Sequence, residues 1–148
     1  MPAPSPKRLP RVTEMAHALI KERLGPGDRA IDATVGNGHD TLFLADCVGK
    51  KGEVIGFDLQ PEAIRSTRQR LGSCDHVVLH EKGHELLASH TGGLVHAITF
   101  NLGYLPGGDK SIITQPDTTL KALVASLECL DPRGLLTVVA YPGHTGGD

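Results

Sequence analysis

Five short apolar segments alternate with helical patterns along this chain of 148 residues. The apolar segments predict strands over 29–33, 53–58, 76–80, 94–100 and 135–141. The stretches before and between them repeat apolar residues at helical spacing, which predicts helices over 12–24, 40–48, 61–71, 84–90 and 118–130. Strands that are separated by helices pair in parallel, with helices on both faces of the sheet. The sequence therefore predicts an α/β fold whose ligands bind at the carboxyl ends of the strands.

The composition is that of one globular domain, with 39% apolar and 22% charged residues. No apolar run approaches the roughly 20 residues that cross a membrane, so no membrane partner is expected. The three cysteines are isolated, which indicates a reducing compartment such as the cytoplasm. The net charge is −2, so contact with a nucleic acid has to be local. Lys7, Arg8 and Arg11 make residues 1–11 a flexible basic arm, which precedes a domain over 12–148.

The stretch AIDATVGNGHDTLFLA joins the first predicted strand to the next helix through a glycine turn. Gly36 and Gly38 allow the backbone to adopt positive φ and to approach a ligand closely. Asp32 and Asp40 flank the turn, and Thr41 follows it. Two carboxylates repel the pyrophosphate of a dinucleotide but suit a ligand that carries an ammonium and a sulfonium. S-adenosylmethionine is such a ligand, so the turn predicts a site for this cofactor.

The segment GFDLQ places Asp58 at the end of the second predicted strand, about twenty residues beyond the glycine turn. An acid at this position accepts hydrogen bonds from both hydroxyls of a ribose. NAD and S-adenosylmethionine share that free diol. Asp58 therefore predicts a bound nucleoside without deciding the reaction.

The segment NLGYLPGGDK directly follows the fourth predicted strand. An Asn at that strand end, followed by a turn with Tyr and Pro, resembles the NPPY signature of amino-group methyltransferases. A nitrogen nucleophile needs its N–H bonds directed at acceptors, so that its lone pair faces the methyl group. A side-chain carbonyl of Asn101 together with a backbone carbonyl can direct them.

These motifs and the C-terminal YPGH together resemble the rRNA methylase family of class I methyltransferases, over nearly the whole chain. Characterised members of that family are tRNA 5-(aminomethyl)-2-thiouridine methyltransferases of bacteria and plant organelles. The resemblance implies a Rossmann-like fold, S-adenosylmethionine as cofactor, and the anticodon region of tRNA as partner. It implies methyl transfer to the aminomethyl nitrogen of the wobble uridine, in the cytoplasm or in an organelle. A homodimer is a further expectation.

The resemblance also assigns roles to individual residues. The residues that it implies for cofactor binding are Gly36, Asn37, Gly38, Asp40, Asp58, Gln60 and, near the adenine, Gly83 and His84. The residues that it implies for the acceptor pocket are Asn101 and Tyr104 on one side, with Tyr141 and His144 on the other. The fold of this class normally has two further strands after the fifth, and the chain stops before them. A sheet that lacks these C-terminal strands and has one uncovered edge is therefore expected.

Three other interpretations compete with this one. The run from His80 to His84 fits the zinc-protease pattern H-E-x-x-H, but that pattern requires a helix, and Gly83 follows an apparent strand here. No metal ligand is therefore predicted. A non-catalytic nucleotide-binding module is a second alternative, and an amino-group methyltransferase acting on rRNA or a small amine is a third. The remaining histidines, which include His17, are interpreted as surface or helix-end residues.

Overall fold

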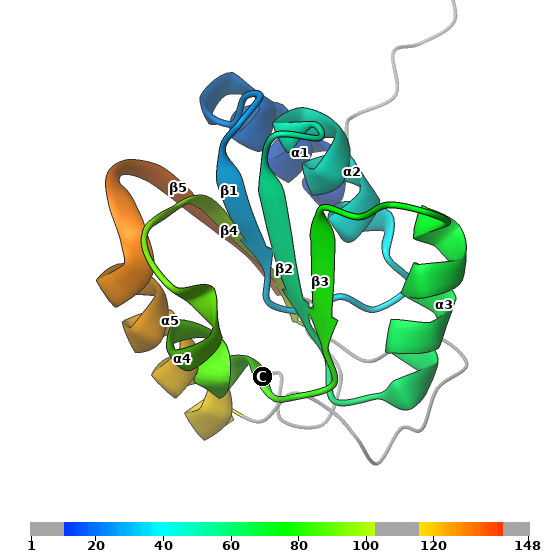
Figure 1. Ribbon diagram of the computed structural model, residues 1–148. Coiled ribbons are helices and arrows are strands. Elements are labelled where there is room, and N and C mark those ends of the chain that lie inside the picture. Colours follow the sequence, from blue (N-terminus) through cyan, green and yellow to red (C-terminus); the bar gives the residue numbers. More distant parts are fainter. Residues whose placement is uncertain (1–10, 103–115, 141–148) are drawn as a thin grey trace, which may run out of the picture.

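The computed structural model describes residues 11–102 and 116–140. Within these residues, five parallel strands form one central sheet (Figure 1). The pairing order across the sheet is β3-β2-β1-β4-β5. The strands are β1 (Arg29–Asp32), β2 (Glu53–Phe57), β3 (Val77–His80), β4 (Val95–Leu102) and β5 (Leu130–Ala140). The order reverses between β1 and β4, and the carboxyl ends of strands at such a point form the usual ligand site of the fold.

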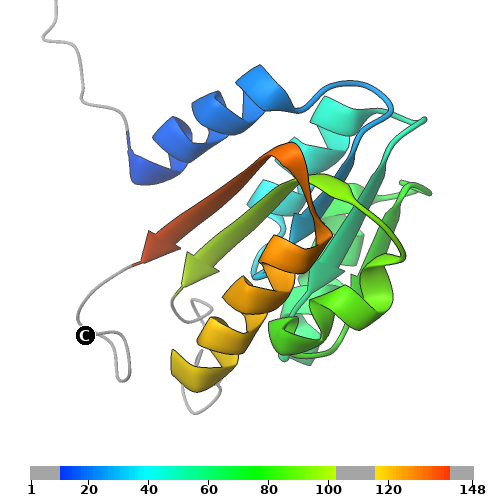
Figure 2. The same cartoon turned by 90° about the vertical axis from the view of Figure 1, so that its left-hand side faces the viewer.

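Helices cover both faces of the sheet (Figure 2). The helices are α1 (Val12–Arg23), α2 (His39–Val48), α3 (Pro61–Leu71), the short 3-10 helix η1 (His84–Leu86), α4 (Leu87–Thr91) and α5 (Pro116–Cys129). Helix α1 packs over β4 and β5, and α2 packs over β1 and β2. Helices α4 and α5 pack together on the opposite face. The structure thus confirms the predicted parallel α/β fold.

Side chains of the strands alternate between two hydrophobic clusters, as the period of two in a strand requires. Ala30 of β1 packs with Ile20 of α1 and Leu44 of α2 on one face. The next residue, Ile31, packs with Leu87 of α4 on the other face. Both strand residues are completely buried. The sheet is therefore covered on both sides near β1, and its strand ends are held at fixed positions.

Most element boundaries agree with the sequence prediction to within two residues, and two do not. The predicted helix 84–90 is divided into η1 and α4. Strand β5 begins at Leu130 rather than at residue 135, because Leu130 already pairs with Val95 of β4. A register shift between Val95 and Ala97 absorbs the extra residues of β5. Within the described ranges, no helix has both the length and the apolar character that a membrane crossing needs.

Candidate active site

The carboxyl ends of β1, β2 and β4 bring three predicted motifs together. The glycine turn follows Asp32 at the end of β1, Asp58 follows β2, and Asn101 lies near the end of β4. Because the three strands are neighbours and parallel, these motifs lie at one edge of the sheet. The spacing in the sequence predicted this arrangement, and the fold confirms that the three motifs share an edge.

The glycine turn has the backbone conformation that its two glycines permit. Gly36 has φ 58° and Gly38 has φ 87°, both in the left-handed region that favours glycine. A side chain at Gly38 would also collide with α3, since an added Cβ would lie 2.7 Å from Oγ1 of Thr67. The turn therefore requires glycine for its conformation and, at Gly38, for close packing against α3.

Asp58 connects the end of β2 to the glycine turn. One carboxylate oxygen accepts the backbone N–H of Gly36 at 2.9 Å, and the other accepts the backbone N–H of Gln60 at 2.8 Å. Gln60 itself is buried and precedes α3 as its N-cap residue. A carboxylate offers about four acceptor positions, so both oxygens of Asp58 keep a lone pair for a further donor. Asp58 is half-buried and is thus both a support of the turn and an acceptor at the site.

Asp32 lies beneath the turn and is completely buried. Its carboxylate accepts the Thr34 backbone N–H at 3.1 Å and the Thr41 hydroxyl at 2.6 Å. Burial is the main reason why the pKa of Asp32 rises to about 7, and the charge of Asp40 raises it further. Ionised Asp32 is therefore costly without a nearby cation.

Helix α3 holds the turn from the other side through two side chains. Thr67 donates its hydroxyl to the Gly36 carbonyl at 3.2 Å, and Arg70 donates Nε–H to the Asn37 carbonyl at 2.9 Å. Neither Thr67 nor Arg70 was predicted as a site residue, because only the fold brings α3 against the turn. Asn37 itself lies at the tip of the turn and is half-buried.

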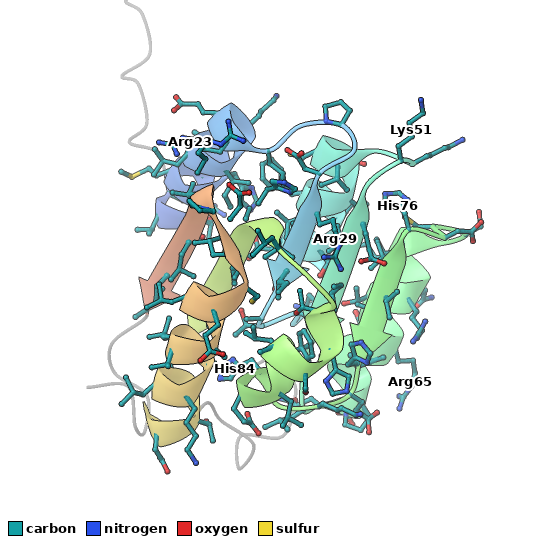
Figure 3. All side chains as sticks on the ribbon, turned by 60° about the vertical axis from the view of Figure 1, so that its left-hand side comes forward. Arg23, Arg29, Lys51, Arg65, His76 and His84 are labelled. Carbon is teal, nitrogen blue, oxygen red and sulfur yellow. The ribbon has the colours of Figure 1, made fainter. Side chains whose placement is uncertain are left out.

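The Gly83–His84 pair follows β3 and is buried. His84 donates Nδ1–H to the Ala33 carbonyl at 3.2 Å, which leaves Nε2 as an acceptor. Burial lowers the pKa of His84, so the neutral imidazole prevails near neutral pH. Figure 3 shows His84 at the end of the molecule opposite to Lys51 and His76, which lie near the amino ends of the strands. His84 thus reaches the edge of the sheet that carries the glycine turn.

Asn101 is half-buried, and its backbone N–H donates to the hydroxyl oxygen of Thr34 at 2.6 Å. Thr34 lies between β1 and the glycine turn, so this bond fixes the end of β4 beside the predicted cofactor site. The other predicted pocket residues, Tyr104, Tyr141 and His144, lie outside the described residues.

The position of His17 differs from the expectation that it is a surface or helix-end residue. It lies within α1, is half-buried, and contacts Asp40 of α2 through Nε2 at 2.5 Å. Its ring stacks on Phe43, with centroids 4.0 Å apart and planes 3° from parallel. The sequence could not predict this contact, because the two residues lie 23 positions apart and nothing in the helical pattern of α1 marks His17.

The H-E-x-x-H run does not form the helix that a zinc protease needs. His80 ends β3 and His84 begins η1. In the described part of the chain, no three side chains of His, Cys, Asp or Glu gather as a metal site would require. The geometry of this run gives no support to the peptidase interpretation.

The site has the carboxylates of Asp32, Asp40 and Asp58 around the glycine turn, in which Gly38 leaves no room for a side chain on the α3 side. Lone pairs of Asp58 suit the hydroxyls of a ribose, and the negative charge of Asp32 and Asp40 suits an ammonium. This set of acceptors fits the nucleoside and the amino-acid end of S-adenosylmethionine. It does not fit a pyrophosphate.

Comparison with known proteins agrees with this geometry. A solved structure titled as that of a putative rRNA-methylase from Clostridium thermocellum superimposes with a TM-score of 0.91 at 42% identity, over 95% of this chain and 77% of that one. A putative methyltransferase from Streptococcus mutans in complex with SAH superimposes with a TM-score of 0.83 at 37% identity, over 90% of this chain and 74% of that one. The sheet order, the glycine turn and the acid after β2 define a Rossmann-like methyltransferase domain.

The family follows from a model described as “Putative rRNA methylase”, which matches residues 54–148. The chain belongs to this family. A model of protein-L-isoaspartate(D-aspartate) O-methyltransferase matches residues 8–87, which hold the glycine turn.

A curated relative, the chloroplastic tRNA (mnm(5)s(2)U34)-methyltransferase of Arabidopsis thaliana, is 43% identical over 152 residues. The match covers 93% of this chain and 55% of that protein, so the chain spans little more than half of the relative's length.

Proposed function

We propose that the chain transfers a methyl group from S-adenosylmethionine to the aminomethyl nitrogen of wobble 5-aminomethyl-2-thiouridine in tRNA. The observation that carries this proposal is the bond between the Asn101 backbone and Thr34. It holds the backbone of Asn101 next to Thr34, two positions before Gly36, and the amide side chain of Asn101 is of the kind that orients amines. The name of the Arabidopsis relative, a tRNA methyltransferase, supports tRNA as the substrate.

In this proposal, S-adenosylmethionine supplies a methyl group that its sulfonium already activates. Asp58 accepts the ribose hydroxyls, while its bonds to Gly36 and Gln60 keep it in place. The charge of Asp32 and Asp40 favours the ammonium of the amino-acid end. His84 offers a neutral acceptor nitrogen at the adenine end. The Streptococcus mutans structure with bound SAH supports this choice of cofactor.

The acceptor amine has to lose a proton before its lone pair can attack the methyl carbon. Burial of an amine favours its neutral form, because desolvation disfavours the ammonium. Asn101 then accepts one N–H bond and directs the lone pair, without a carboxylate that would hold the ammonium. Tyr104, Tyr141 and His144 complete the pocket in this proposal. His144 or Tyr141 takes or relays the proton. The new N–C bond forms as the C–S bond breaks, and sulfur keeps the electron pair.

The RNA surface in this proposal is local. Arg65 and Arg68 are exposed on α3, and Figure 3 shows Arg65 on the outer side of that helix. Together with Arg11 and the basic residues before it, they provide cations for the backbone phosphates of the anticodon region. A homodimer would extend this surface. The compartment is the cytoplasm or an organelle, the latter in keeping with the chloroplastic relative.

Mass spectrometry of digested nucleosides tests the proposal. The protein is incubated with S-adenosylmethionine and tRNA that carries 5-aminomethyl-2-thiouridine at the wobble position. We expect this nucleoside to be converted into 5-methylaminomethyl-2-thiouridine. Ribosomal RNA and small primary amines are tested in parallel, and methylation of either one with the tRNA unchanged would favour the alternative acceptor. Cofactor binding without turnover on any of the three would indicate a non-catalytic module.

A further inference from the structure

His17 of α1 contacts the first turn of α2, which directly follows the glycine turn. Its Nε2 lies 2.5 Å from Oδ1 of Asp40, and its ring stacks on Phe43 one turn further along α2. Both partners are substantially buried, with side-chain exposures of 29% for His17 and 15% for Asp40. A contact between two such groups restricts both side chains and is poorly screened by solvent. It therefore ties α1 to the first turn of the helix that leaves the glycine turn.

Asp40 in turn acts on the buried Asp32. Its charge is the second largest cause, after burial, of the raised pKa of Asp32. The charge of Asp58 adds a smaller effect in the same direction. The charges of Asp40 and Asp58 thus both disfavour the ionised form of Asp32, beside a site whose ligand carries an ammonium.

Other charged side chains lie on the elements around the site. Arg70 of α3 donates Nε–H to the Asn37 carbonyl of the glycine turn, Glu14 of α1 accepts the Arg11 backbone N–H, and His39 is exposed at the start of α2. The remaining charged residues of these helices are exposed, namely Lys21, Glu22, Arg23, Asp46, Glu62, Arg65 and Arg68, and η1 carries the half-buried Glu85 beside His84. His84 donates to the Ala33 carbonyl and is held neutral by burial, which lowers its pKa. His17 is the imidazole in contact with one of the three acids.

We propose that His17 is a positioning residue of the cofactor site, which fixes the Asp40 carboxylate beside the glycine turn. This inference rests on the proposed assignment of Asp32 and Asp40 to the cofactor site. The contact at 2.5 Å and the stacking of the ring on Phe43 hold both side chains in one orientation.

The substitutions His17→Phe and His17→Gln test this role. Phenylalanine keeps a ring that can stack on Phe43 but has no nitrogen for Asp40, whereas the amide nitrogen of glutamine can still donate to the carboxylate. Binding of S-adenosylhomocysteine, which keeps the ammonium, is measured by calorimetry. We expect His17→Phe to bind about fivefold or more weakly than the wild type, and His17→Gln to match it within about twofold.

His76→Phe provides a matched control. His76 is also half-buried and also contacts α2, with Nε2 3.1 Å from the Ala45 carbonyl, but it precedes β3 at the amino ends of the strands. Its replacement should leave the affinity for S-adenosylhomocysteine within about twofold of the wild type. Thermal unfolding of each variant establishes that the folded protein is being compared.

A second arm uses the Asp40→Asn variant, in which the carboxylate that His17 positions is absent. In this background, His17→Phe should change affinity by less than about twofold. If His17→Phe does not fold, His17→Ala takes its place in both backgrounds. Unchanged affinity after loss of the His17 nitrogen would overturn the proposal, as would an equal loss of affinity with and without the Asp40 carboxylate. The assay needs no tRNA, so its outcome is independent of the proposed methyl acceptor.

Discussion

The carboxylate of Asp58 accepts the backbone N–H of Gly36 at 2.9 Å, although 22 positions separate the two residues. This bond joins the end of β2 to the glycine turn after β1. It explains why two motifs that are weak signals separately form one site in the fold. The Asp58 side chain stabilises the conformation of the turn, and in the proposed function it also accepts hydrogen bonds from the ribose.

Replacement of Asp58 by Ala should therefore weaken binding of S-adenosylmethionine by about 1.5–3 kcal/mol, the range for a lost hydrogen bond to a charged group. Calorimetry measures the change. Asp46→Ala is the matched control. This substitution removes the same charge, but Asp46 is exposed on α2 and lies away from the turn. Equal affinities of the Asp58 variant and the wild type would contradict the ribose assignment.

Asp32→Asn should make the cofactor-free protein more stable at alkaline pH. Ordinary aspartate has a pKa near 3.9 when unfolded, whereas that of buried Asp32 is about 7 in the fold. The folded protein therefore retains a proton between about pH 4 and 7, and the stability that depends on it is complete below about pH 4 and lost as pH rises through 7. Asparagine never ionises, so urea unfolding should show a gain on the order of 2–4 kcal/mol near pH 8. The gain should vanish towards pH 4, and a gain independent of pH would show that ionisation is not its cause.

Gly38→Ala should destabilise the protein more than Gly27→Ala does. Both glycines have φ close to +90°, at 87° and 88°, but nothing lies within 4 Å of a Cβ added at Gly27. The strain of positive φ is thus common to both variants, and only Gly38 adds the collision with Thr67. Urea unfolding should give Gly38→Ala an extra loss of about 1–3 kcal/mol. Similar losses at the two positions would mean that α3 moves aside without penalty.

Asn101→Ala should reduce methyl transfer by about 10²-fold or more and leave cofactor affinity within about twofold. The bond that fixes this position is made by the backbone N–H of Asn101, and alanine retains it. The side-chain carbonyl is therefore the group removed. Single-turnover kinetics and calorimetry on the same preparation separate the two effects. A parallel loss of cofactor affinity would instead assign Asn101 to the cofactor site.

Arg65 and Arg68 should account for part of the salt dependence of tRNA binding. Each phosphate contact to a single strand contributes about 0.7 to the slope of log K against log salt concentration. Replacement of both by Ser should therefore lower the magnitude of the slope by about 1.4. Lys50→Ser with Lys51→Ser removes the same charge, and Figure 3 shows Lys51 at the amino ends of the strands, away from the site. Equal slopes for the two double variants would exclude α3 as the RNA surface.

The features that the sequence predicted well have strong local signals. Helix α3 begins at Pro61 and ends at Leu71 as expected, because Pro is favoured at the first helical position and Gly72 follows the last. The glycine turn and Asp58 were placed correctly, since parallel strands bring their carboxyl ends to one edge.

The features that it missed depend on contacts between distant parts of the chain. The pairing of Leu130 with Val95 extends β5 across a segment that contains Pro132. The local sequence of this segment is typical of a turn. The approach of α1 to α2 gives His17 its partner, and no spacing within α1 encodes that approach.

The central claim is methyl transfer to the aminomethyl nitrogen of the wobble uridine, and isotope-labelled cofactor tests it most directly. The protein is given S-adenosylmethionine with a deuterated methyl group and two tRNA preparations, which differ only in whether the wobble uridine carries the aminomethyl group. We expect the label in one nucleoside of the first preparation, with fragmentation placing it on the side-chain nitrogen, and none in the second. Label in both preparations, or on a base or ribose position instead of that nitrogen, would contradict the proposed function.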